Sequence, residues 1–152
     1  MNQTNQPKTT PMMYDPETVL VVMKPEQKEL AGLVQKAIMD YQGISNVTVV
    51  SDEVSAISHI NQNRADIVIA GYDCGSVVRY IEQHDRKGLL TLAVTQNGVP
   101  ADVKLSSTKE LTDFVQSPKL LREAYWGNED AQTMRREGEY IARNLERRAQ
   151  EN

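Results

Sequence analysis

Four short runs of β-branched and aliphatic residues recur along the chain, and segments of helical periodicity separate them. The runs are TVLVVM (18–23), VTVV (47–50), ADIVIAG (65–71) and LLTLAVT (89–95). Strands that are apolar on both faces are typical of a parallel sheet with helices covering each side. Strands and helices alternating in this order, joined by right-handed crossovers, predict a doubly wound α/β sandwich with a mainly parallel sheet of five strands.

The fifth strand is predicted at VKLSS (103–107), a weaker run than the other four. Only QNGVP (96–100) and the start of ADV separate it from the fourth run, whereas a helical crossover needs about a dozen residues. The helix that would normally cover this crossover is therefore predicted to be reduced or missing. The short link also leaves antiparallel pairing of the last strand as an alternative.

Composition narrows the chemistry that such a domain can carry. The 152 residues suit one domain, and they include one cysteine and two histidines. This scarcity excludes a disulfide framework within the chain and a multi-cysteine zinc site, and we expect no metal and no cofactor.

The net charge of −4 argues against general nucleic-acid binding. No apolar run has the length of a membrane span and no signal peptide is visible, so we expect a cytoplasmic protein.

The layout from about residue 18 to 116 resembles the receiver domains of two-component response regulators. ADIVIAG (65–71), followed later by LLTLAVT (89–95), carries most of the resemblance. In that family the first strand ends in an acidic pair that binds magnesium, and the third ends in the aspartate that accepts phosphate. The fourth strand ends in threonine or serine, and the fifth in a lysine. The resemblance implies a flavodoxin-like or CheY-like fold and a role in bacterial signal transduction.

We carry these family positions over to this sequence one by one. The acidic pair falls on Met23 and Lys24, and the phosphate acceptor falls on Gly71. The threonine falls on Thr95, and the lysine falls near Ser107. Phosphoryl transfer needs a divalent cation, and magnesium needs hard oxygen ligands. Met23 offers none, Lys24 repels the metal, and Gly71 has no side chain to phosphorylate. The sequence therefore predicts a degenerate pseudo-receiver that is not an enzyme, has no catalytic residues and acts independently of phosphorylation.

Other reactive side chains near the predicted strand ends are better explained by structural roles. Asp73 follows the third strand, but its YDCG context favours a turn and a helix cap over catalysis. Cys74 lies near a helix N-terminus but has no histidine near it in sequence, so a structural cysteine is favoured. His59 and His84 lie near predicted helix ends, and a shared metal site is not favoured. No glycine-rich phosphate loop follows the first strand.

The chain is predicted to have three parts. Residues 1–16 are rich in Asn, Gln, Thr and Pro and read as a flexible leader. Residues 17–116 form the receiver-like domain, and residues 117–152 form a helical extension that begins with a Ser-Pro helix-start signal.

Within the extension, one narrow helical stripe is close to the pattern of a two-stranded seam. Its members are Met134, Gly138, Ile141, Leu145 and Ala149. The large aromatic residues Tyr125 and Trp126 are candidate anchors for a binding surface, and the stripe supplies the remaining candidate protein-binding residues. The structural alternative is that this helix packs back on the sandwich.

Two functional hypotheses follow from these patterns. The first is a regulatory module that binds a protein partner or self-associates through residues 117–152. The second is a sensor that binds a nucleotide or another small polar ligand at the C-terminal edge of the sheet, near Thr95.

Overall fold

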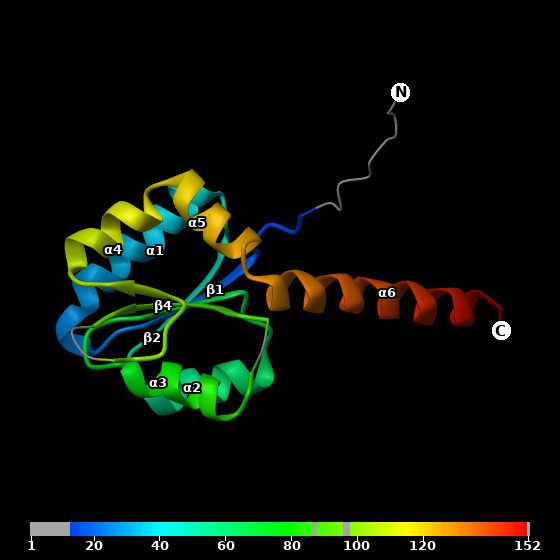
Figure 1. The fold of residues 1–152 in the computed structure, drawn as a ribbon, viewed down its shortest axis with the longest axis horizontal. Helices are drawn as coiled ribbons and strands as arrows, with labels where there is room; N and C mark the ends of the chain where they lie inside the picture. The colour runs from blue at the N-terminus through cyan, green and yellow to red at the C-terminus, as the bar shows by residue number, and fades with distance from the viewer. Residues whose placement is uncertain (1–12, 87, 96–97, 152) are drawn as a thin grey trace, which may run out of the picture.

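A computed structural model describes residues 13–86, 88–95 and 98–151. Five strands form one sheet in the order β2-β1-β3-β4-β5, and every neighbouring pair is parallel (Figure 1). The strands are β1 (Thr18–Val22), β2 (Asn46–Val50), β3 (Ile67–Ala70), β4 (Leu90–Val94) and β5 (Val103–Leu105). The helices are η1 (Pro25–Gln27), α1 (Lys28–Gln42), α2 (Glu53–Gln62), α3 (Gly75–Gln83), α4 (Thr108–Val115), α5 (Pro118–Trp126) and α6 (Glu129–Glu151).

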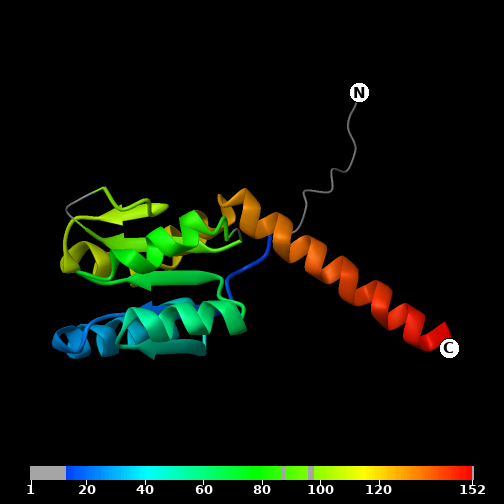
Figure 2. The same ribbon diagram turned by 90° about the horizontal axis from the view of Figure 1, so that it is seen from below.

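Helices cover the sheet on both sides. In Figure 1, α1, α4 and α5 lie on one face, and α2 and α3 lie on the other. Figure 2 shows α6 leaving this sandwich and projecting away from it. The doubly wound architecture predicted from the apolar runs is therefore confirmed, with a helical extension at the C-terminal end.

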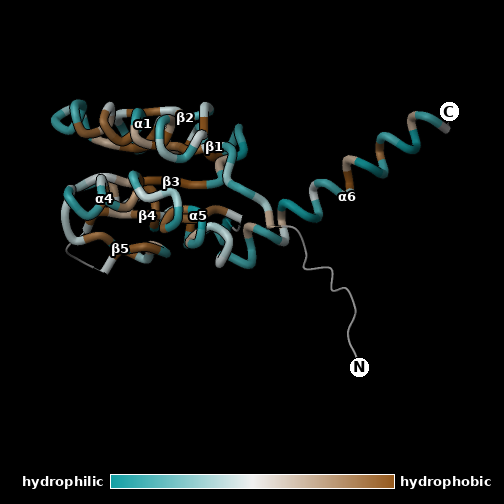
Figure 3. Tube along the Cα trace, turned by 90° about the horizontal axis from the view of Figure 1, so that it is seen from above, coloured by the Kyte–Doolittle hydropathy of each residue, from teal (hydrophilic) through white to brown (hydrophobic). Residues whose placement is uncertain are grey.

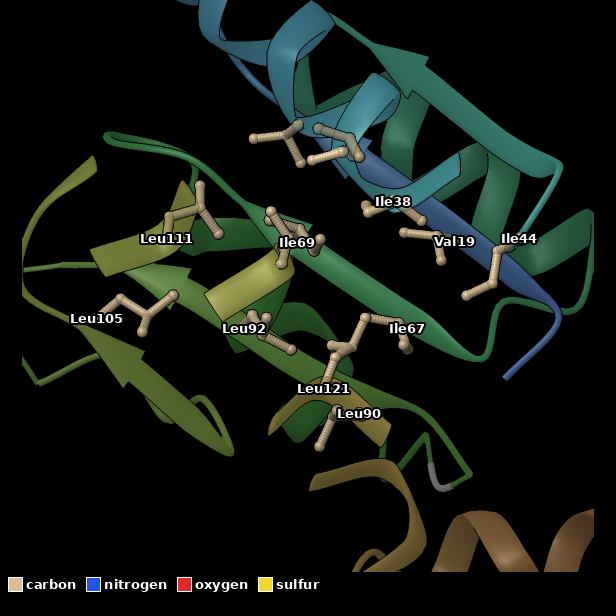
Figure 4. Packing of buried hydrophobic residues seen from close by; sticks show 14 of the residues in the cluster. Val19, Ile38, Ile44, Ile67, Ile69, Leu90, Leu92, Leu105, Leu111 and Leu121 are labelled. Carbon is tan, nitrogen blue, oxygen red and sulfur yellow. The ribbon is translucent and has the colours of Figure 1, made fainter. Parts of the chain in front are cut away.

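Alternate residues of each central strand supply two separate apolar cores. Val19 and Val21 of β1 point into the core under α1, α4 and α5, whereas Leu20 and Val22 point into the core under α2 and α3. The strands therefore stand out as the hydrophobic segments of the trace in Figure 3. Figure 4 shows the first core, in which residues of β1, β3 and β4 meet side chains from the covering helices. Burial on both faces explains why these runs are apolar throughout.

The last strand is parallel to its neighbour, so the antiparallel alternative is wrong. Leu92 pairs with Val103 and Val94 with Leu105 in parallel register. Among the described residues of the link, 95 and 98–102, no helix is present, which agrees with the prediction of a reduced or missing helix. Val99 is buried in the core under α2 and α3, so the link covers that face with a side chain in place of a helix.

The helix α5 belongs to the core of the receiver-like domain. Leu121 and Tyr125 are fully buried among residues of α1, α4 and the sheet. The predicted division between residues 116 and 117 therefore does not separate two cores. The prediction of Tyr125 as a surface anchor is wrong, because its ring faces inward. Trp126 is partly buried, and its Nε1 donates a hydrogen bond to Asp15 Oδ1 at 3.0 Å.

Residues before β1 contact the extension. Residues 1–12 of the predicted leader lie outside the described residues, but Tyr14 and Gln132 exchange two hydrogen bonds. The Tyr14 backbone nitrogen donates to Gln132 Oε1 at 2.8 Å, and Gln132 Nε2 donates to the Tyr14 carbonyl at 3.0 Å. The segment that enters β1 is thus held against the first turns of α6.

Two adjacent leucines of α5 test whether this helix belongs to the core. We expect Leu121→Ala to lower the free energy of unfolding by about 2–5 kcal/mol, because it removes a fully buried side chain. Leu120→Ala is the matched control, since Leu120 is exposed, and we expect a change within about 0.5 kcal/mol. Urea unfolding followed by circular dichroism measures both. Equal effects of the two substitutions would contradict the placement of α5.

Candidate functional site

The ends of β1 and β3 bring Met23 and Gly71 together at the C-terminal edge of the sheet. The Gly71 nitrogen donates to the Val22 carbonyl at 2.8 Å, so the pairing of the two strands continues to this point. A Cβ atom placed on Gly71 would lie 2.8 Å from Met23 Cγ and 2.7 Å from Gln27 Oε1. Real Cβ atoms do not approach other heavy atoms so closely. The space in which a side chain at position 71 would stand is therefore filled by Met23 and Gln27.

Gln27 was not among the residues predicted for this site. It ends the single turn η1, which begins at Pro25 directly after the β1 strand end. The turn folds back over the sheet edge and directs the Gln27 amide at Gly71. The Gln27 Oε1 atom is buried and has no hydrogen-bond partner among the residues that the structure describes. A Pro at the first position of a helical turn was visible in the sequence, but the inward orientation of the residue two places later was not.

Lys24 forms an ion pair at the same edge. Its Nζ lies 2.9 Å from Oε1 of Glu53, the first residue of α2. The hydroxyl of Ser76, from the first turn of α3, donates to the other carboxylate oxygen of Glu53. The hydrogen bond to Glu53 and the charge of its carboxylate raise the pKa of Lys24, so the ammonium stays protonated at neutral pH. The Glu53 carboxylate at this edge is thus paired with a lysine.

The turn after β3 holds Asp73 and Cys74. Asp73 is exposed and has a φ of 64°, a left-handed conformation that aspartate tolerates better than most residues. The prediction of a turn is right, but the prediction that Asp73 caps α3 is wrong, because Cys74 is the N-cap residue and no side chain caps the helix. Burial raises the pKa of the Cys74 thiol, and its side chain is fully inaccessible. This agrees with a structural role for Cys74.

Thr95 and Ser107 complete the positions carried over from the family. The Thr95 nitrogen donates to the Leu105 carbonyl at 3.0 Å, so Thr95 extends the pairing of β4 with β5. Thr95 also lines an open pocket of about 570 Å³ together with Asp73, Ser76 and Arg79. Ser107 instead caps α4, its Oγ accepting a hydrogen bond from a backbone nitrogen at 3.1 Å. The structure therefore groups Met23, Lys24 and Gly71 closely, with Thr95 farther along the edge.

The described part of the chain contains no group of three His, Cys, Asp or Glu side chains that could hold a metal ion. His59 lies on α2, and His84 follows α3, where its ring stacks at a tilt on Tyr80 with centroids 4.0 Å apart. Within the same residues, no helix has both the length and the apolar character to cross a membrane.

Solved structures share this fold. No family model and no curated protein matches the sequence. The receiver domain of the Francisella response regulator 1452 superposes with a TM-score of 0.53 at 20% identity, covering 73% of this chain and 97% of that chain. The phosphorylated cyanobacterial phytochrome response regulator RcpA gives 0.50 at 14% identity, covering 72% and 94%. The Mn²⁺-bound response regulator Rcp1 gives 0.50 at 17% identity, covering 65% and 89%.

These likenesses show that the chain has the α/β fold of response-regulator receiver domains. They bear on the fold alone, because the identities are low. The resemblance stated from the strand sequences is thereby confirmed at the level of the fold.

The predicted protein-binding residues of α6 lie on an exposed face. Met134, Ile141 and Leu145 are 53%, 57% and 60% exposed, and the projecting helix carries hydrophobic positions among hydrophilic ones in Figure 3. The alternative that this stripe packs back on the sandwich is thus not what the structure shows for Ile141 and Leu145, whereas Met134 lies beside Gly88 of the sandwich. Their role in binding remains a prediction.

Two glycine substitutions test how tightly the position of the phosphate acceptor is filled. We expect Gly71→Ala to lower the free energy of unfolding by about 1–3 kcal/mol, because the new methyl group overlaps Met23 Cγ. The control is Gly32→Ala in the exposed middle of α1, where a Cβ meets nothing within 4 Å. That change is expected to stabilise the protein by up to about 1 kcal/mol. Chemical denaturation measures both, and a neutral Gly71→Ala would show that the space is open.

Proposed function

We propose that the chain is a non-enzymatic, phosphorylation-independent pseudo-receiver that acts in bacterial, cytoplasmic signal transduction through protein–protein contact. The observation that supports this best is the filled space at Gly71. A receiver that responds to phosphate needs a carboxylate there and a metal beside it. Here the side chains of Met23 and Gln27 fill the space at position 71. Lys24, which pairs with Glu53, is the residue that the resemblance aligns with a metal-binding acid.

The missing helix between β4 and β5 supports the same proposal. In active receivers that helix and its neighbours belong to the face that switches. In this chain the described part of the link contains no helix, and Val99 is packed into the core instead. We therefore assign the interaction to the extension, whose exposed apolar residues on α6 offer a surface for a protein partner or for self-association.

A phosphorylation assay tests the proposed function. After incubation with acetyl phosphate and Mg²⁺, we expect no phosphoryl group on the protein, as measured by intact mass and by Phos-tag electrophoresis. An active receiver domain serves as the positive control, and Asp73→Ala removes the exposed acid nearest the site. Stoichiometric labelling of the unaltered protein would contradict phosphorylation independence, whether or not Asp73→Ala abolishes it.

A second candidate function is supported by the pocket that Thr95 lines. It has polar walls from Asp73, Ser76 and Arg79 and lies at the C-terminal edge of a parallel sheet, where such folds bind ligands. In this reading the chain senses a small polar molecule, and the pocket offers it both the Arg79 guanidinium and the carboxylates of Glu53 and Asp73.

A thermal-shift screen of nucleotides and small organic anions distinguishes the second candidate from the first. If the pocket is a ligand site, one compound raises the melting temperature, and Thr95→Val and Arg79→Ala each reduce that shift. The matched control is Arg122→Ala, a partly buried arginine outside this pocket, which should leave the shift unchanged. A screen without any stabilising compound would count against this second function.

A further inference from the structure

The apolar stripe of α6 has the spacing of a two-stranded coiled coil. We define the stripe as Met134, Gly138, Ile141 and Leu145, which follow one another at intervals of four, three and four residues. These are the alternating intervals of the two core positions in a heptad. The three larger side chains are all more than half exposed, although Met134, at the base of the helix, also lies beside Gly88 of the sandwich. Such a seam is typical of a helix that pairs with a second helix.

The order of residues within the stripe favours an antiparallel partner of the same sequence. The intervals are symmetrical about the middle of the stripe. An antiparallel second copy therefore sets Met134 against Leu145 at both ends, and Gly138 against Ile141 twice in the centre. Large and small residues then complement each other in the central layers. A parallel pair would stack Gly138 on Gly138 and leave a void, which is costly in an apolar interface.

The charge along α6 favours the same direction. Acidic residues outnumber basic ones in 129–139, and basic residues outnumber acidic ones in 140–151. The acids of the first part are Glu129, Asp130, Glu137 and Glu139, and the basic residues of the second part are Arg143, Arg147 and Arg148. In an antiparallel pair, the basic second part of each helix lies beside the acidic first part of the other helix. In a parallel pair, parts with the same charge lie side by side.

A groove at the base of α6 extends the surface beyond the helix itself. Its volume is about 620 Å³, and it lies between α6 and the N-terminal edge of the sheet. Met134 and Gly138 line it from the helix, and Ile60, Gly88 and Leu89 line it from the sandwich. Because Leu145 and Ile141 of an antiparallel copy lie opposite Met134 and Gly138, that part of the copy's α6 faces this groove. The contact then includes the sandwich as well as the two helices.

We propose that a second copy of this chain covers the α6 stripe in antiparallel orientation, with Ile141 and Leu145 of each α6 facing the groove at the base of the other. This inference rests on the proposed function, because it names the partner of the surface assigned there. It makes the assembly a symmetric dimer in which two receiver-like sandwiches lie at opposite ends of a helical pair.

The mass in solution tests the dimer. Sedimentation equilibrium should give twice the chain mass of 17.1 kDa. Ile141→Glu and Leu145→Glu should each raise the dissociation constant more than about tenfold, because a charge enters the seam. Tyr140→Glu is the matched control: Tyr140 is 66% exposed on the same helix but lies outside the stripe, so the dimer should persist. A monomeric wild-type chain at high micromolar concentration, or a Tyr140→Glu variant as weak as Ile141→Glu, would overturn the proposal.

Disulfide trapping tests the orientation. The only cysteine, Cys74, is fully buried, so introduced thiols can be oxidised selectively. A mixture of Met134→Cys and Leu145→Cys proteins should form a mixed disulfide under mild oxidation, while neither variant should cross-link alone. Cross-linking of each variant with itself would show parallel helices and overturn the proposal. Circular dichroism confirms that the variants are folded.

The outcome of the dimer experiments and the outcome of the phosphorylation assay are independent of each other. A monomer that takes up no phosphate overturns only the dimer, and a dimer that takes up phosphate overturns only phosphorylation independence.

Discussion

The placement of the extension depends on the need to surround the buried carboxylate of Asp66 with positive charges and hydrogen-bond donors. Asp66 is 1% exposed and immediately precedes β3, at the N-terminal edge of the sheet. A carboxylate removed from water in this way destabilises the fold unless charges and hydrogen-bond donors surround it. The backbone nitrogens of Glu17 and Thr18 donate to its Oδ2 at 2.7 and 3.2 Å, and Arg64 and Arg135 pair with it at 3.4 Å. These contacts tie segments that are far apart in the sequence to the same Asp66 carboxylate.

Arg135 carries this constraint into α6. Its guanidinium also donates to the Tyr125 hydroxyl and to the Asp15 carbonyl, both at 3.0 Å, and lies 5.1 Å from the centre of the Tyr14 ring. Burial raises the pKa of Tyr125 to about 12, so this phenol stays neutral beside the Asp66–Arg135 pair. The first turns of α6 are thus bound to α5, to the segment before β1 and to the sheet. The direction in which the free part of the helix projects follows from these contacts.

The sequence predicted those features that arise from local pattern. Each buried strand was recognisable as a continuous apolar run because both of its faces are covered. The stripe of α6 was visible because helical spacing alone defines it. Met23, Lys24 and Gly71 were located because they lie at the ends of recognisable strands.

Features that depend on tertiary contact could not be read in this way. Tyr125 looked like a surface anchor because nothing local reveals that α5 packs against the sheet, where the ring is fully buried. Asp66 looked like an ordinary residue next to a strand, although it is the central acceptor of a polar network. Gln27 showed no signal at all, since its contact with Gly71 depends on how the η1 turn folds over the sheet edge.

The crowding around Gly71 also limits which residues this position can accept. An aspartate there would meet the Met23 side chain, and the adjacent Lys24 ammonium is held in place by Glu53. A carboxylate introduced at Gly71 on its own is therefore opposed by packing, and it fits only where Met23 and Gln27 change or move as well.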